Sequence, residues 1–211
     1  MSAVGLYRGL PARVRWHVGL RAWTCPMEAV ADRLPREGRL LDVGCGHGLF
    51  SNLAALSNPA LSVLGVDPSE EKIHWASASA SGRDNPRFLR GSVEDLPEDG
   101  FDVVAVLDVL YLVQRERWPA FLGACRDRLR SGGLLLLKEV DLTPRWKFYR
   151  CMLQETMSVR LLGITLGRAF AFAGRDEMRA ALEEAGFRDL RCQDLGRGYL
   201  TPHLLYEAAR G

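Results

Sequence analysis

Short apolar runs alternate with longer segments of helical periodicity from residue 39 onward. Short apolar runs bounded by turn residues are typical of buried strands, and their alternation with helical segments is typical of a parallel sheet covered by crossover helices. The five runs that predict strands in this part of the chain are RLLDV (39–43), LSVLGVD (61–67), PRFLRGS (86–92), FDVVAVLDVL (101–110) and LLLLKEVD (134–141). Two further strand-like runs, FRDLRCQDL (187–195) and PHLLYEAAR (202–210), finish the chain.

The segments between these runs predict helices. They are LFSNLAALS (49–57), PSEEKIHWASASA (68–80), WPAFLGACRDRLR (118–130) and RDEMRAALEEAGF (175–187). Pro119 belongs in the first turn of its helix, where the missing N–H costs no hydrogen bond. Ser131, Gly132 and Gly133 are expected to end the same helix, because glycine favours helix C-termini.

Two segments fall outside this alternation, and both are basic and apolar. Residues 1–25 contain four arginines and no acid, and their run Arg13–Val18 alternates in a way that fits a strand as well as a helix. Residues 142–175 contain six Lys or Arg and one acid, and Tyr149, Leu153, Met157 and Leu161 recur every four residues, which favours an amphipathic helix. We expect residues 1–36 to be a helical extension and residues 142–175 to form a lid over the site.

Composition limits the classes of protein that fit. A chain of 211 residues is long enough for one domain, and its 47% apolar and 26% charged residues are ordinary for a soluble protein. Five scattered cysteines without a CxxC pair argue against a disulfide framework or a zinc ribbon, and no histidine has metal-ligand spacing, so no metal site is predicted. The N-terminus lacks a secretory signal pattern, which predicts a cytoplasmic protein.

Three glycines at alternate positions follow the first predicted strand. The run LDVGCGHG places Gly44, Gly46 and Gly48 two residues apart, which differs from GxGxxG and from the GxxxxGK[ST] phosphate loop. Asp67 ends the second predicted strand 19 residues after Gly48, where a carboxylate can accept hydrogen bonds from two ribose hydroxyls. The pattern predicts a binding loop for a nucleoside without a pyrophosphate.

In their order and spacing, LDVGCGHG, VLGVD, GSVEDLP, FDVVAVLDVLYL and LRSGGLLLLKE resemble the class I S-adenosylmethionine-dependent methyltransferases over residues 39–141. The resemblance implies an α/β, Rossmann-like fold: a seven-stranded, mostly parallel sheet with an antiparallel last strand and helices on both faces. We therefore expect one methyltransferase domain over residues 1–211, with the cofactor-binding core at 37–141 and a C-terminal helix and strands at 176–211.

The same resemblance implies S-adenosylmethionine as cofactor and S-adenosylhomocysteine as product, with no metal. The implied cofactor-binding positions are Asp42, Gly44, Cys45, Gly46, Asp67, Pro68, Ser92, Val93, Leu107 and Asp108. Asp42 and the glycine loop would hold the methionine portion, Asp67 the ribose, and the backbone of Val93 the adenine. Ser92 departs from the family, which often has an acid there, and a hydroxyl is a weaker acceptor than a carboxylate.

Methyl transfer depends mainly on alignment, which can supply about 7–11 kcal/mol. A general base is needed only for a hydroxyl or an acidic carbon. Glu139, Asp141 and Tyr111 are the candidate catalytic residues, because they follow the fifth and fourth predicted strands. Two residues apart on an extended backbone, Glu139 and Asp141 point to one face. The alternative for Glu139 and Asp141 is that they are solvated acids that cap the next helix. The alternative for Tyr111 is half-buried packing. His47, inside the glycine loop, could touch the ligand or the acceptor, but a residue at that position more often faces away as the helix begins.

The basic, apolar flanks favour a small-molecule or lipid-like acceptor, and they would suit one that carries an anionic group. We expect O- or C-methylation rather than N-methylation. Nucleic acid is disfavoured, because Asp108–Tyr111 lacks the [DNS]PP[YF] motif of base-amine enzymes. The alternatives are an RNA, DNA or protein methyltransferase and a non-catalytic protein that binds S-adenosylmethionine. The arginine-rich start could also contact an anionic membrane surface. The sequence leaves the oligomeric state open.

Overall fold

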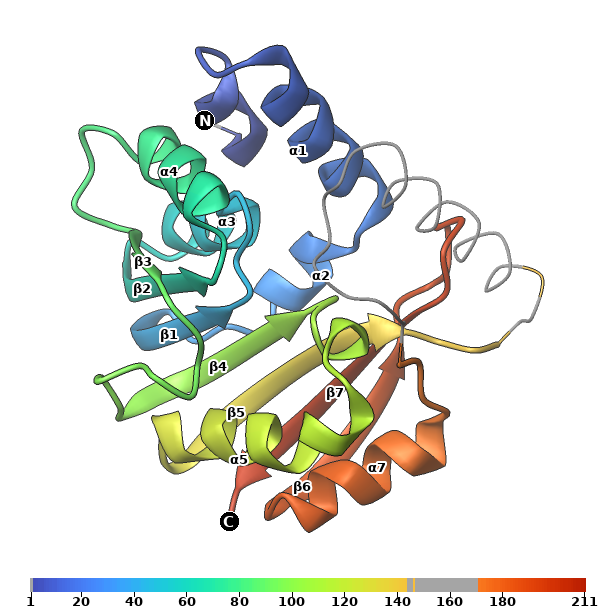
Figure 1. Ribbon diagram of the computed structural model, residues 1–211. Coiled ribbons are helices and arrows are strands. Elements are labelled where there is room, and N and C mark those ends of the chain that lie inside the picture. Colours follow the sequence, from blue (N-terminus) through green and yellow to red (C-terminus); the bar gives the residue numbers. More distant parts are fainter. Residues whose placement is uncertain (1, 144–145, 147–170) are drawn as a thin grey trace.

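The computed structural model describes residues 2–143, 146 and 171–211. Its centre is a seven-stranded sheet of order β3-β2-β1-β4-β5-β7-β6 (Figure 1). The strands are β1 (Glu37–Val43), β2 (Ala60–Asp67), β3 (Arg87–Arg90), β4 (Phe101–Leu107), β5 (Leu129–Val140), β6 (Phe187–Asp194) and β7 (His203–Arg210). Strand β7 runs antiparallel to both of its neighbours, and the other pairs are parallel. The predicted fold class is confirmed.

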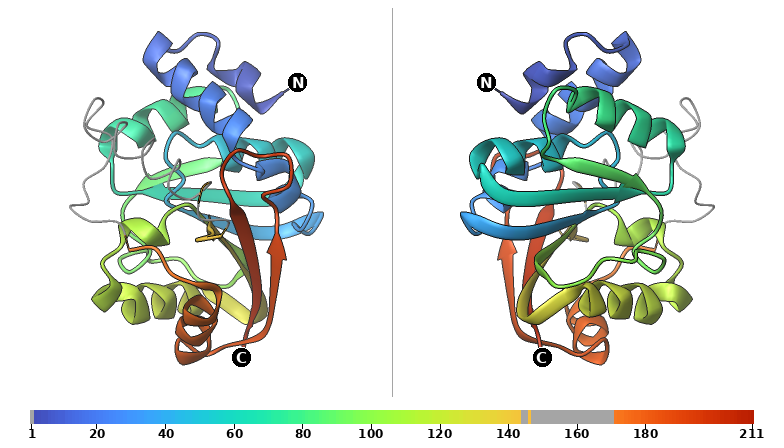
Figure 2. Two further views of the ribbon diagram at one scale, coloured as in Figure 1. Left: turned by 90° about the vertical axis from the view of Figure 1, so that its right-hand side faces the viewer. Right: turned by 90° about the vertical axis from the view of Figure 1, so that its left-hand side faces the viewer.

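Helices cover both faces of the sheet. The helices are α1 (Ala12–Thr24), α2 (Met27–Ala31), α3 (Leu49–Ser57), α4 (Glu70–Ser79), α5 (Trp118–Arg128) and α7 (Arg175–Glu184). Buried side chains of α1, α2 and α3 pack on one face, and those of α5 and α7 pack on the other. Burial of these apolar stripes against the sheet explains why both faces are covered. Figure 2 shows α1, in blue, at the outer edge of the molecule.

The ambiguous run Arg13–Val18 is helical. Val14 and Val18, four residues apart, are buried, whereas Trp16 between them is 67% exposed. A strand would have placed all three side chains on one face, so the burial pattern has the helical period.

Several predicted boundaries were wrong, among them the start of β5, which lies at Leu129 instead of Leu134. Strand β4 ends at Leu107 instead of continuing to Leu110, because Asp108 takes a left-handed backbone conformation (φ 57°) and a 3₁₀ turn follows. Helix α5 ends at Arg128, before the predicted stop at residues 131–133, because Leu129 already pairs with Phe101. The register then shifts, and regular pairing resumes between Val103 and Leu134.

The predicted amphipathic helix at Tyr149, Leu153, Met157 and Leu161, and most of the proposed lid at 142–175, lie outside the described residues. Within the described part of the chain, no helix has the length and apolar character needed to cross a bilayer.

Candidate functional site

The glycine loop follows β1 at the carboxyl edge of the sheet. The N–H groups of Gly44 and Cys45 donate to the carbonyl of Val66 in β2, at 2.8 and 3.0 Å. Gly44 and Gly46 both have left-handed backbone conformations, with φ of 70° and 56°. A Cβ at Gly44 would lie 2.4 Å from Cγ2 of Val109, whereas a Cβ at Gly46 would meet nothing within 4 Å. Gly44 is therefore required by packing, and Gly46 leaves the main chain open to a ligand.

Asp67 lies at the end of β2, against this loop. Its Oδ2 accepts a hydrogen bond from the N–H of Gly46 at 3.0 Å, and its Oδ1 accepts one from the N–H of Ser69 at 2.9 Å. An ionised carboxylate offers about four acceptor positions. Two backbone donors thus fix the carboxylate of Asp67 and leave acceptor capacity for two ligand hydroxyls.

Asp42 lies beneath the loop. Its Oδ2 accepts a hydrogen bond of 2.5 Å from the hydroxyl of Ser51 in α3, and the residue is buried. Burial raises the pKa of Asp42 to about 7, although the hydrogen bond from Ser51 opposes the shift. The contact that the structure gives Asp42 therefore joins the end of β1 to α3, on either side of the loop. Cys45 is half-buried within the loop, and burial raises its pKa.

The predicted adenine side follows β3. Val93 is fully buried, and its carbonyl accepts a hydrogen bond from Arg128. The hydroxyl of Ser92 donates to Oδ2 of Asp95 at 2.9 Å, so its oxygen keeps acceptor capacity. Pro68, on the other flank, is exposed next to Asp67.

The N-terminal extension packs on the glycine loop. The hydroxyl of Tyr7 donates to the carbonyl of His47 at 2.7 Å and accepts a hydrogen bond from Asn52 in α3 at 2.9 Å. The ring of His17 in α1 lies 4.8 Å, between centroids, from the ring of His47. Burial lowers the pKa of each histidine to about 4, and the nearby His47 adds to the effect on His17. Both rings are neutral at physiological pH. His47 thus faces α1 in this structure.

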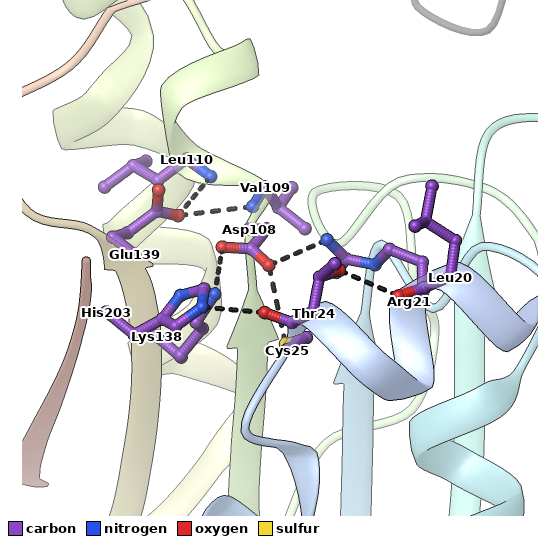
Figure 3. A network of polar contacts seen from close by, with 10 residues as sticks. All are labelled: Leu20, Arg21, Thr24, Cys25, Asp108, Val109, Leu110, Lys138, Glu139 and His203. Carbon is purple, nitrogen blue, oxygen red and sulfur yellow. Dashed lines mark hydrogen bonds and ion pairs between the residues drawn. The ribbon is translucent and has the colours of Figure 1, made fainter. Parts of the chain in front are cut away.

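A buried ion network joins α1 to β4 and β5 (Figure 3). Oδ1 of Asp108 lies 2.5 Å from Nζ of Lys138, which is fully buried in β5, and Oδ2 lies 2.9 Å from the guanidinium of Arg21 in α1. The thiol of Cys25 approaches Oδ2 at 3.7 Å, and Nε2 of His203 contacts the carbonyl of Thr24 at 2.9 Å. These contacts fix the C-terminal end of α1 over the carboxyl ends of β4 and β5.

The charges of this network do not cancel. Burial opposes ionisation of Asp108, but Lys138 and Arg21 outweigh it and hold the pKa of the carboxyl well below its usual range. Burial disfavours the charged forms of Lys138 and Arg21, and Asp108 restores them and raises both pKa values. Two cations thus share one carboxylate, which leaves an excess positive charge beside the end of β4.

Glu139 follows Lys138 and lies on the opposite face of β5. Its Oε1 accepts hydrogen bonds from the N–H groups of Val109 at 3.2 Å and Leu110 at 2.8 Å. Burial, followed by the charge of Asp108, raises the pKa of Glu139 to about 8. The side chain is therefore mostly protonated at neutral pH, and its proton can be exchanged near physiological pH.

A small pocket adjoins Glu139. Its lining residues are Tyr111, Glu139, Val140, Ala171, Phe172, Ala173, Met178 and Tyr206. The rings of Tyr111 and Phe172 are stacked, with centroids 5.1 Å apart and an angle of 12° between their planes. The pocket therefore combines aromatic and apolar walls with one titratable carboxyl group.

Asp141 has a different environment from Glu139. Its Oδ2 lies 2.6 Å from the guanidinium of Arg175 and accepts a hydrogen bond from the hydroxyl of Thr143 at 2.9 Å. Asp141 does not line the pocket described above. The structure thus places Glu139 and Tyr111 together and gives Asp141 a cationic partner in α7.

Arg21 and Lys138 were missed by the sequence analysis. Lys138 carried a detectable signal, because a single lysine inside the apolar run LLLLKEVD is almost never buried without a partner. Arg21 carried none beyond the basic character of residues 1–25. Among the described residues, no group of three or more His, Cys, Asp or Glu side chains is arranged to hold a metal ion.

Comparison with known proteins agrees with this geometry. Residues 16–191 match the family model described as a methyltransferase domain. The chain is 38% identical over 115 residues to a ubiquinone biosynthesis O-methyltransferase of Rhizobium rhizogenes, covering 53% of this chain and 45% of that protein. It is 32% identical over 107 residues to a probable fatty acid methyltransferase of Mycobacterium tuberculosis, covering 49% of this chain and 25% of that protein. The chain thus spans less than half the length of either relative.

Solved structures share the fold across most of the chain. The magnesium protoporphyrin IX methyltransferase of Synechocystis, with S-adenosylhomocysteine bound, matches with a TM-score of 0.69 at 21% identity, covering 98% of this chain and 92% of that one. The cyclopropane synthase of Mycobacterium tuberculosis matches with a TM-score of 0.68 at 15% identity, covering 86% and 82%. At these identities the likeness concerns the fold.

Proposed function

Because this chain belongs to the class I S-adenosylmethionine-dependent methyltransferases, we propose that it transfers a methyl group from S-adenosylmethionine to a small-molecule or lipid-like acceptor. The observation that carries the proposal is the pairing of Gly46 with Asp67. An open main-chain position lies directly beside a carboxylate that two backbone donors have already oriented.

The residues at the loop fit the cofactor of this family. In our proposal Asp67 binds the ribose hydroxyls, and Gly46 allows the methionine portion to approach the main chain, with Asp42 supporting the loop from below. Val93 and Ser92 would border the adenine, and Leu107 would end β4 beside the methionine ammonium. The cofactor supplies an electrophilic methyl group, so the task of the protein is to align the acceptor with it.

We propose that the acceptor binds beside the water-sized pocket lined by Tyr111, Phe172 and Glu139. The stacked rings offer a flat apolar wall, and Glu139 provides a carboxyl group whose pKa suits proton transfer near neutral pH. For a hydroxyl acceptor, the oxygen would form the bond to the methyl carbon as the sulfur–carbon bond breaks, and Glu139 would take the hydroxyl proton. We favour Glu139 over Asp141 as the base, because Asp141 is paired with Arg175.

Two observations support a lipid-like acceptor with an anionic group. Proteins similar to this chain are named for methylation in ubiquinone biosynthesis and of fatty acids. The excess positive charge of Arg21 and Lys138 over Asp108 would favour an anionic group beside the end of β4.

Transfer of radiolabelled methyl from S-adenosylmethionine into a cell extract tests the proposal. Label in the organic-soluble fraction is the expected result, and label only in nuclease-sensitive material would refute the small-molecule acceptor. Absence of transfer despite cofactor binding, in extracts enriched in lipid precursors, would favour a non-catalytic protein.

The role of Glu139 is tested separately with Glu139→Gln. As a base, Glu139 must be ionised, so the rate at saturating substrate should rise as pH increases through about 8. Glu139→Gln should keep cofactor affinity, lose about 10²–10⁴-fold in rate and lose this pH dependence. Asp141→Asn is the matched control, and an equal loss in that variant would contradict the assignment.

A further inference from the structure

Helix α1 is apolar on two opposite faces. Val14 and Val18 are buried against the protein, whereas Trp16 and Trp23 are 67% and 69% exposed. At 100° per residue, the two tryptophans lie within about 20° of each other and nearly opposite the two valines. A solvated helix face normally carries polar side chains, so two large exposed aromatic groups on one line indicate a contact surface.

Two unpaired cations lie in the same N-terminal segment as these tryptophans, and Arg15 directly precedes Trp16. Arg13 is paired with Glu71, and Arg21 with Asp108, but Arg8 and Arg15 are exposed and have no ion pair in the described part of the chain. Residues 1–25 contain no acid at all. The surface formed by Trp16, Trp23, Arg8 and Arg15, here called the tryptophan face, is therefore positively charged.

Helix α1 is anchored next to the candidate site. It is held by the contact between the rings of His17 and His47, by the pairing of Arg21 with Asp108 and by the contact of the Thr24 carbonyl with His203. All three contacts are made to the carboxyl edge of the sheet. The tryptophans lie opposite the valines that α1 packs against the protein, and both views of Figure 2 show the blue helix at the outer edge of the molecule.

We propose that the tryptophan face docks on an anionic lipid surface. Tryptophan prefers the boundary between acyl chains and headgroups, and each arginine near an anionic bilayer adds attraction. Docking would hold α1, which contacts the residues of the candidate site, at the bilayer, from which a lipid-like acceptor could enter; this last step rests on the function proposed above.

Cosedimentation with vesicles tests the docking without cofactor or acceptor. Vesicles of phosphatidylcholine alone are compared with vesicles that also contain phosphatidylglycerol. The unchanged protein should bind the anionic vesicles, and binding should weaken with added salt. Trp16→Ala with Trp23→Ala should reduce the partition coefficient roughly tenfold, and Arg8→Gln with Arg15→Gln should reduce it roughly 30-fold.

Arg36→Gln with Arg188→Gln is the matched control, because it removes two exposed arginines at the amino edge of the sheet. An equal weakening in this control, or binding that ignores phosphatidylglycerol, would overturn the proposal. Failure of the unchanged protein to bind either vesicle would also overturn it. So would the finding that the protein is a dimer which the tryptophan substitutions dissociate, while no vesicle binding is seen.

Cofactor affinity and methyl transfer to an extract are measured on the same preparations. If the unchanged protein fails to dock but transfers methyl normally, the lipid surface alone is refuted. If it docks but does not bind the cofactor, the proposed function alone is refuted. Melting temperatures of the variants should be unchanged, because the replaced side chains are exposed.

Discussion

Replacement of Gly46 by alanine tests separately the stability of the glycine loop and its proposed binding of the cofactor. At Gly46 an added methyl group would meet no heavy atom within 4 Å, so packing should not oppose Gly46→Ala. The remaining cost is conformational, because the residue has φ of 56°. An L-residue in this region costs about 1–2 kcal/mol. Gly46→Ala should therefore lower the free energy of unfolding by about that amount.

Cofactor binding should suffer more than stability. The new methyl group would project into the open side of the loop, where we place the methionine portion. We expect at least a tenfold loss of affinity for S-adenosylhomocysteine, which is about 1.4 kcal/mol or more, measured by isothermal titration calorimetry. The free energy of unfolding is obtained from urea denaturation of the same preparations.

Two further glycines make the comparison quantitative. Gly82 has φ of 77° and nothing within 4 Å of an added Cβ, but it lies in the loop after α4, so Gly82→Ala should cost the same stability and leave affinity intact. Gly44→Ala should cost about 1–3 kcal/mol more, because its Cβ would lie 2.4 Å from Val109. Unchanged affinity of Gly46→Ala for S-adenosylhomocysteine would refute the proposal that the glycine loop binds the cofactor. If Gly46→Ala loses as much stability as Gly44→Ala, the conclusion that an added Cβ at Gly46 meets no neighbouring atom is refuted.

Three other outcomes follow from the same contacts. Lys138→Met removes one of the two cations that contact Asp108 and leaves Arg21 in place, so urea denaturation should show a loss of about 1.5–3 kcal/mol, that of a hydrogen bond to a charged group; an unchanged stability would mean that the pair is not needed. The neutral rings of His17 and His47 resist protonation in the folded state, while an unfolded chain takes up protons below its ordinary pKa of 6.5. These two rings should therefore contribute a loss of stability as pH decreases from about 6.5 to about 4, seen as the difference between the profiles of the unchanged protein and of His17→Gln with His47→Gln; identical profiles would contradict the buried, neutral pair. Asp67→Ala should weaken cofactor binding by about 1.5–3 kcal/mol in calorimetry, because hydrogen bonds to a charged acceptor are lost; an unchanged dissociation constant would remove Asp67 from the site.

Sequence and structure agree best where the determining contacts are local. The alternation of strands and helices predicted the sheet, and the glycines after β1 predicted a loop whose positive φ angles the structure contains. The placement of Asp67 beside that loop also followed from the sequence, because parallel neighbours β1 and β2 end at the same edge. The end of β4 at Leu107 and the end of α5 at Arg128 did not follow from the sequence, because they depend on the backbone at Asp108 and on pairing with Phe101.

The sequence by itself determined the fold class and the glycine loop with its positive φ angles, since periodicity, glycine positions and strand ends are properties of neighbouring residues. Only the tertiary structure decided which acids share an environment. Glu139 and Asp141 are two residues apart, yet one is buried against the N–H groups of Val109 and Leu110 and the other is paired with Arg175. Burial and charged partners distant in the chain set ionisation, and no local pattern encodes them.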